Sequence, residues 1–238
     1  MGMKMKERLD KFIASQTELS RKLAQKAIKE KRVTVNGAVI SAAEIKIDTD
    51  SDTVALDGKP LTYKKYVYYM MYKPSGAVSA TEDSAERTVL DLIPPQMKRT
   101  GLFPAGRLDK DTTGLLILTD DGDYAHRMLS PKKHVVKRYI ATLDREPDEG
   151  VAERFADGIV LGDGTVCKSA KAELLGSKRA ALEISEGKYH QVKRMFAALG
   201  YHVEALERVR IGALALDKRM HPGEVREMSA EEAARVFE

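Results

Sequence analysis

The chain has 238 residues, of which 43% are apolar, and a formal net charge of +4, so it can form one large domain or two smaller ones. Its single cysteine, Cys167, excludes an internal disulfide and a multi-cysteine zinc site, and we expect it to be a packing residue. No apolar run reaches the roughly eighteen residues of a membrane span, and no apolar stretch follows the charged start, so we expect a cytoplasmic protein without a signal peptide.

Positive charge is concentrated at the beginning of the chain. Residues 1–65 hold 14 Lys and Arg against 9 Asp and Glu. Such an excess attracts polyanions. This region therefore predicts an electrostatic contact module.

The first expected element is a short helix near the start. Leu9, Phe12 and Ile13 recur at the spacing of one helical face. Asp10 lies off that face, so we expect it to be exposed to solvent.

A second helix and a hairpin follow. Ser20 is a suitable N-cap for a helix from Arg21 to about Lys29. Asn36-Gly37 favours a two-residue turn, which predicts strands at 32–35 and 38–40. The inner face of the helix is expected to consist of Leu23, Ala24, Ala27 and Ile28.

Turn-forming residues dominate 49–65 and predict a boundary near residue 60, with domains at 5–60 and 66–238. Later strands are expected at 66–72, 137–143, 159–161, 166–174, 180–185 and 203–216. Later helices are expected at 123–129, 148–156, 190–199 (closed by Gly200) and 229–237 (opened by a Ser229/Glu232 capping box). Strands predominate, which fits a mixed, mainly antiparallel α+β domain.

The most informative segment is 106–122, Gly-Arg-Leu-Asp-Lys-Asp-Thr-Thr-Gly-Leu-Leu-Ile-Leu-Thr-Asp-Asp-Gly. Gly106 and Gly114 interrupt regular structure, whereas residues 115–118 form a short apolar run typical of a buried strand. The carboxylate of Asp109 is therefore expected in a loop held by a rigid core element.

Two other interpretations of this loop are open. One is an ordinary turn acid in solvent. The other is a calcium loop, because Asp109, Asp111, Thr113, Gly114 and Asp120 have EF-hand-like spacing. An EF-hand needs helices on both sides, but Pro104 precedes the loop and a strand is expected after it.

The segment resembles the signature motif of the RsuA-type pseudouridine synthases, in which the Asp of Gly-Arg-Leu-Asp is catalytic. The resemblance implies that Asp109 is the catalytic residue. It also implies that Arg107 fills the gap left by a flipped uridine, although phosphate binding is an equal alternative. Arg-Leu-Asp-Lys occurs again at residues 8–11, without glycines on both sides.

Three further positions match the same family. In the segment Gly-Lys-Tyr-His-Gln-Val-Lys-Arg-Met, Lys193 takes the place of the family's catalytic basic residue and Arg194 follows it. Because the two cations are adjacent, which one pairs with Asp109 stays open, and either could bind phosphate. Tyr139 matches the catalytic tyrosine that stacks on the target base and can move its proton, and Ile211 resembles the apolar residue that packs against that base. A core role is the alternative for both.

The beginning of the chain resembles the S4 RNA-binding domain. A solvated basic face is the alternative interpretation of its charge. Phe12 is the only aromatic residue near this face, which favours recognition of RNA backbone and shape over base stacking. The expected RNA contacts are Arg8, Lys11, Arg21, Lys22, Lys26 and Lys29.

Together the resemblances imply an α+β protein with a small S4-like domain followed by a mainly antiparallel catalytic domain. They imply isomerisation of a uridine in 16S ribosomal RNA, without cofactor or metal, membrane association or an obligatory protein partner. Residues 184–195 look most like the family member that acts on 16S rRNA, and an enzyme for 23S rRNA is the alternative. A non-catalytic S4-type assembly factor would have no reason to keep Asp109, Tyr139 and Lys193 together.

Overall fold

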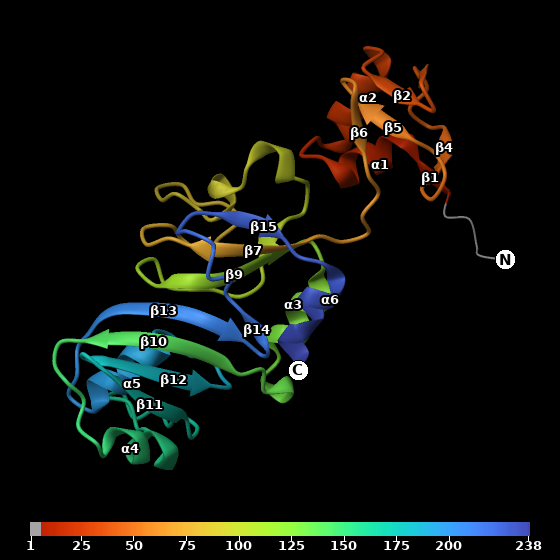
Figure 1. Ribbon diagram of the computed structural model, residues 1–238. Coiled ribbons are helices and arrows are strands. Elements are labelled where there is room, and N and C mark those ends of the chain that lie inside the picture. The colour runs from red at the N-terminus through yellow and green to blue at the C-terminus, as the bar shows by residue number, and fades with distance from the viewer. Residues whose placement is uncertain (1–5) are drawn as a thin grey trace. The chain divides into compact units, whose positions relative to one another are not determined.

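A computed structural model describes residues 6–238, and the chain divides into two units (Figure 1). The first unit covers Met1–Val67 together with Ile93–Leu102. The second covers Tyr68–Leu92 and Phe103–Glu238. No helix in the described part of the chain is long and apolar enough to cross a membrane.

The first unit packs two helices against short strands. Its helices are α1 (Leu9–Gln16) and α2 (Arg21–Lys29), as the apolar spacing predicted. A four-stranded sheet has the order β3-β2-β5-β6, and β1 pairs with β4 separately. The strands are β1 (Lys6–Arg8), β2 (Val33–Val35), β3 (Ala38–Val39), β4 (Lys46–Asp48), β5 (Val54–Leu56) and β6 (Lys59–Leu61).

Two local predictions in this unit are confirmed. The Ser20 hydroxyl accepts a hydrogen bond from the Leu23 amide at 3.3 Å, so it caps α2. Asn36 and Gly37 have φ values of 51° and 81°, which a type I′ hairpin turn requires at both central positions. Turn and cap chemistry therefore fixes where α2 begins and where β2 turns back.

The expected exposure of Asp10 is wrong, because this residue is fully buried. Its carboxylate accepts hydrogen bonds from Arg8 Nε at 3.1 Å, Arg21 Nε at 3.1 Å and Gln25 Nε2 at 2.7 Å. The Arg8 guanidinium holds the pKa of Asp10 well below its usual range. A charge can be buried when it is paired in this way. The expected place of Leu23 on the inner face of α2 is also wrong, since this residue is 50% exposed.

The second unit is built on one large sheet. Its strand order is β11-β12-β10-β13-β9-β7-β15, with β8 on β9 and β14 on β13. Only the β13–β9 pair is parallel, which confirms the mainly antiparallel mixed sheet. The strands are β7 (Tyr68–Lys73), β8 (Phe103–Pro104), β9 (Thr113–Thr119), β10 (Lys137–Leu143), β11 (Lys171–Gly176), β12 (Arg179–Ile184), β13 (Val203–Ile211), β14 (Leu214–Ala215) and β15 (Val225–Glu227).

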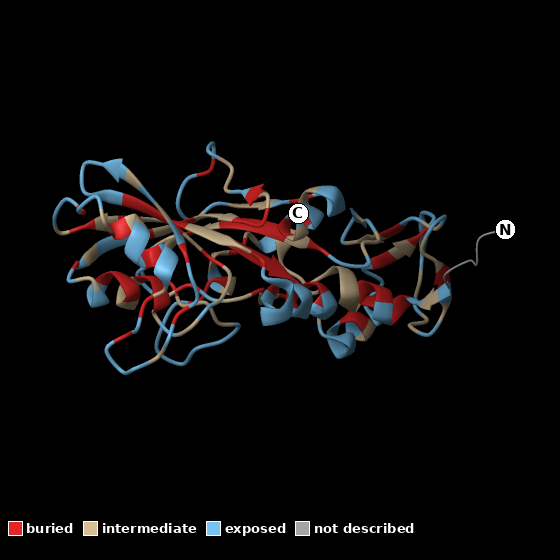
Figure 2. Ribbon diagram, turned by 90° about the horizontal axis from the view of Figure 1, so that it is seen from below, coloured by how far each residue is buried: buried red, intermediate tan, exposed pale blue. Residues whose placement is uncertain are grey.

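Four α-helices accompany this sheet. Figure 1 shows α4 and α5 beside its β11–β13 end, and α3 with α6 near β14. Residues 115–118 of β9 are completely buried, and buried residues follow the central strands while loops are exposed (Figure 2). The sheet thus gives the loop before β9 a rigid anchor. The helices are α3 (Gly122–Leu129), α4 (Val151–Asp157), α5 (Gln191–Ala198) and α6 (Ala230–Ala234).

Three expectations in this unit need correction. The strand expected at 203–216 is a hairpin, because β13 ends at Ile211 and β14 folds back to pair with it. The strand expected at 159–161 and the first part of the one expected at 166–174 are absent. Only an isolated bridge joins Val160 to Val166, and both valines are exposed. The strand β11 begins at Lys171. The capping box of α6 is half formed. Ser229 accepts from the Glu232 amide, but the Glu232 carboxylate pairs with Arg226 instead.

Gly114, the first glycine after Asp109, is required by packing and by backbone conformation. Its φ is +103°, and an added Cβ would lie 2.2 Å from the Arg208 carbonyl oxygen of β13. We expect Gly114→Ala to lower the free energy of unfolding by roughly 3 kcal/mol, measured by urea denaturation. Gly223→Ala is the control, since Gly223 has φ +96° but no atom within 4 Å of its added Cβ. Equal losses in both variants would exclude the clash with β13.

Candidate active site and RNA-binding face

The loop that carries Asp109 is fixed by a buried lysine at the end of β7. Lys73 is fully buried, and its Nζ donates to the carbonyl oxygens of Pro74 at 3.0 Å, Lys110 at 3.1 Å and Thr112 at 2.9 Å. Burial lowers the pKa of Lys73 to about 8. Two of these carbonyls belong to the loop just after Asp109, so Lys73 sets the path of the loop.

Asp109 lies between two groups from the start of α5. Its side chain is 27% exposed, with Oδ2 3.7 Å from Lys193 Nζ and Oδ1 3.6 Å from His190 Nε2. Lys193 Nζ is closer still to Asp111 Oδ1, at 2.5 Å. One ammonium group therefore contacts two loop carboxylates, and its contact holds the pKa of Asp111 below its usual value.

Arg194, the second candidate cation, is held elsewhere. Its Nη2 lies 2.5 Å from Asp163 Oδ2, and its Nη1 donates to the Tyr189 carbonyl at 3.4 Å. Adjacent residues on a helix point in different directions. The structure thus brings Lys193, and not Arg194, to Asp109.

Tyr139 lies on β10 opposite Arg208 of β13, and only 8% of it is exposed. The Arg208 guanidinium carbon is 6.0 Å from the centre of the Tyr139 ring, and Arg208 Nε donates to the Leu115 carbonyl at 2.9 Å. Arg208 Nη2 is buried without a hydrogen-bond partner in the described part of the chain. Tyr139 is therefore held against a buried cation with an unused donor.

The two remaining substrate-binding candidates differ in exposure. Arg107 is exposed at the start of the loop, where it can reach a ligand. Ile211 is completely buried in the core beside Leu115 and Leu214, so it presents no surface to a ligand in this structure.

His190 is the site residue that the sequence reasoning missed. It precedes α5 with φ 47° and ψ 35°, a left-handed conformation that is uncommon for a residue with a side chain. Its ring stacks on that of Tyr189, with centroids 3.8 Å apart and an angle of 17°. Only its position next to Gln191 in the motif could have drawn attention to it.

The calcium interpretation is wrong. The loop runs from β8 into β9, where an EF-hand would have a helix on each side.

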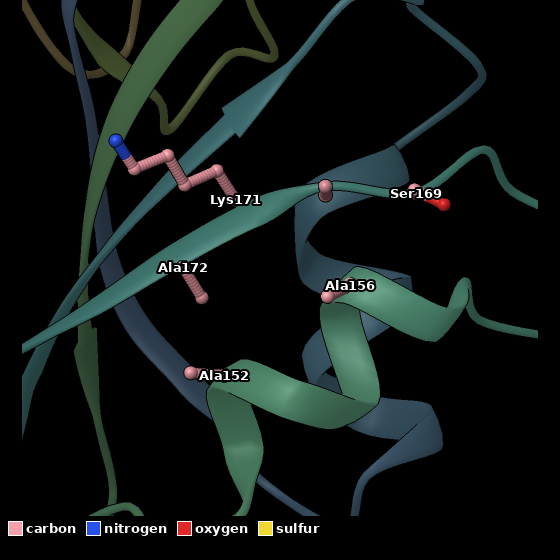
Figure 3. Close-up of a pocket in the computed structure, with 6 residues that line it drawn as sticks. Ala152, Ala156, Ser169, Lys171 and Ala172 are labelled. Carbon is pink, nitrogen blue, oxygen red and sulfur yellow. The ribbon is translucent and has the colours of Figure 1, made fainter.

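A pocket of about 410 Å³ lies outside this site, between α4 and β11 (Figure 3). Its lining residues are Ala152, Ala156, Ser169, Ala170, Lys171 and Ala172, none of which is a site candidate.

The basic side chains of the first unit are only partly available. Arg8 and Arg21 are directed to Asp10, Lys11 pairs with Glu7 at 2.9 Å, and Lys26 lies 3.7 Å from Glu30. Two exposed residues of α2 have no ion pair within the described residues. They are Lys22 and Lys29.

Comparisons with known proteins match both units of the chain. The RNA pseudouridylate synthase family matches residues 67–198, and the S4 domain matches residues 7–54. Ribosomal small subunit pseudouridine synthase A of Escherichia coli (strain K12) is 45% identical over 96% of this chain and 99% of its own length. An uncharacterized RNA pseudouridine synthase of Bacillus subtilis (strain 168) is 43% identical over 94% of this chain and 96% of its own length.

A solved structure agrees over nearly the whole chain. A pseudouridylate synthase crystal structure is 40% identical, covers 96% of this chain and 99% of its own, and has a TM-score of 0.67. The chain therefore belongs to the RNA pseudouridylate synthase family and is a pseudouridine synthase of the RsuA type with an S4 domain.

Proposed function

We propose that this enzyme converts one uridine of 16S ribosomal RNA to pseudouridine, with Asp109 as the catalytic residue and no cofactor. The observation that carries the proposal is the position of Asp109, fixed in a loop beside Lys193 and only partly exposed. The name of the E. coli relative, a small subunit enzyme, supports the choice of 16S rRNA. Such a substrate would place the protein in the cytoplasm.

The reaction needs a carboxylate but no redox partner. The N1–C1′ glycosidic bond breaks, the uracil turns, and C5 bonds to C1′; C5 then loses its proton while N1 gains one. An ionised Asp109 can act as nucleophile on the ribose or the base, or assist formation of a glycal. Lys193 would stabilise the ionised form, and Tyr139 would stack on the base.

Pseudouridine mapping tests the proposal. Ribosomal RNA from cells with and without this protein is compared, and the deleted strain is complemented with the wild type or with Asp109→Asn. We expect one 16S position to lose its modification and only the wild type to restore it. A lost 23S position would replace the 16S assignment, and an unchanged map would favour the non-catalytic assembly factor.

We propose that the first unit binds the RNA backbone through α2. On α2, Lys22 and Lys29 are the lysines that have no ion pair among the described residues, and each contact with phosphate releases counterions. We expect Lys22→Gln with Lys29→Gln to weaken binding of a 16S rRNA transcript. The slope of log affinity against log salt should fall by roughly two units, measured by filter binding.

The matched control removes the same charge elsewhere in this unit. Lys46 and Lys59 are exposed on β4 and β6, so Lys46→Gln with Lys59→Gln has the same net charge. We expect its salt slope to stay near that of the wild type. Equal slopes for both double variants would remove α2 from the interface and leave a general electrostatic attraction.

A further inference from the structure

Tyr189 carries the most exposed of the large apolar side chains in the described part of the chain. It is 75% exposed, although the chain has only 9 tyrosines and 5 phenylalanines, and no tryptophan. One face of its ring is covered by His190, stacked at 3.8 Å. Most of the remaining ring is open to solvent, so a planar group can stack on it.

The stacked pair is connected to Asp109. His190 Nε2 lies 3.6 Å from Asp109 Oδ1, and the left-handed backbone of His190 directs its ring there. Strained conformations of this kind persist where the surrounding structure imposes them, often at functional sites. The Tyr189 ring is thus held at the edge of the site by a group that touches the catalytic carboxylate.

The charged groups around Tyr189 already have partners. Lys188 pairs with Glu186 at 2.5 Å and Arg194 pairs with Asp163 at 2.5 Å. Lys193 is shared between the two loop carboxylates. At this edge the open ring is therefore the group best able to attract a nucleotide, by stacking and not by charge.

We propose that Tyr189 is a stacking platform for the base of a nucleotide that flanks the target uridine. This inference rests on the proposed function, because it needs the uridine at Asp109. A flipped uridine leaves its neighbours without a stacking partner, and an exposed aromatic ring supplies one. Tyr139 is buried against Arg208 and is the residue proposed to stack on the target base, so Tyr189 would hold the neighbouring nucleotide without reading which base it carries.

The absence of tryptophan provides a direct test. Tyr189→Trp in an Asp109→Asn background creates the only tryptophan in the chain, and base stacking quenches indole fluorescence. We expect quenching when an unmodified 16S or 23S rRNA transcript binds. Leu175→Trp in the same background is the control, because Leu175 is 39% exposed and lies near the turn between β11 and β12, at the end of β12 away from Tyr189, and should not be quenched. Binding of either transcript to the Tyr189→Trp variant without quenching of its indole would overturn the proposal.

Truncation of the ring gives a second measurement. We expect Tyr189→Ala to raise the dissociation constant by roughly 5- to 150-fold, while turnover at saturating RNA stays within about threefold. Tyr189→Phe keeps the ring and should restore affinity. Unchanged affinity of Tyr189→Ala, or lost turnover with intact affinity, would contradict stacking. If Asp109→Asn kept its turnover while the indole of Tyr189→Trp was still quenched, the catalytic role of Asp109 would be contradicted and the stacking proposal would stand.

Discussion

Asp109→Asn is expected to lower single-turnover conversion of uridine by at least about 1,000-fold while leaving the fold and RNA affinity nearly unchanged. Asparagine has the same shape but cannot act as an ionised nucleophile. The substitution leaves no cation without a partner, because Lys193 keeps its contact with Asp111 at 2.5 Å. Rates on saturating 16S rRNA transcript, with binding and urea denaturation of the same preparation, measure the three effects.

The neighbouring carboxylate is the matched control. Asp111 is in the same loop and contacts the same lysine, but 70% of its side chain is exposed. We expect Asp111→Asn to lower the rate by about tenfold or less, since Lys193 would still be available to Asp109. If Asp111→Asn lost as much turnover as Asp109→Asn, the catalytic role would belong to the pair or to Asp111.

Local sequence patterns predicted the elements whose cause is local. The Ser20 cap, the Asn36-Gly37 turn and the apolar run 115–118 each act within a few residues, and all three appear where expected. The strand expected at 166–174 begins only at Lys171, because strand formation needs a pairing partner that a sequence window does not contain. Pairing depends on the rest of the sheet.

The burial of Asp10 shows the same limit for charge. Its partners Arg21 and Gln25 come from a second helix, so spacing along α1 alone could only predict an exposed carboxylate. The approach of His190 to Asp109 joins residues 81 positions apart, and no local pattern encodes it. The motif order brought Lys193 and Asp109 into one hypothesis, and the structure brings their side chains within 3.7 Å.

Lys193 and Arg194 should separate catalysis from binding. We expect Lys193→Met to lower the single-turnover rate by roughly 100- to 1,000-fold with little change in RNA affinity. The reason is that the positive charge beside the carboxylates of Asp109 and Asp111 is then lost. Arg194→Met removes the partner of Asp163, outside the loop, and should change turnover by less than about tenfold.

The pH dependence distinguishes a charge effect from a loss of structure. Lys193 holds the pKa of Asp111 below its usual value, so Lys193→Met removes that contact and makes the protonated Asp111 carboxyl group, beside Asp109, more favourable. The rise of activity with pH should therefore move to higher pH in Lys193→Met. Lys193→Arg keeps the charge and should return the profile toward that of the wild type. If the pH profile of Lys193→Met keeps its position while the rate falls, Lys193 serves to position the RNA. If instead Arg194→Met loses turnover and Lys193→Met loses only affinity, the catalytic cation is Arg194.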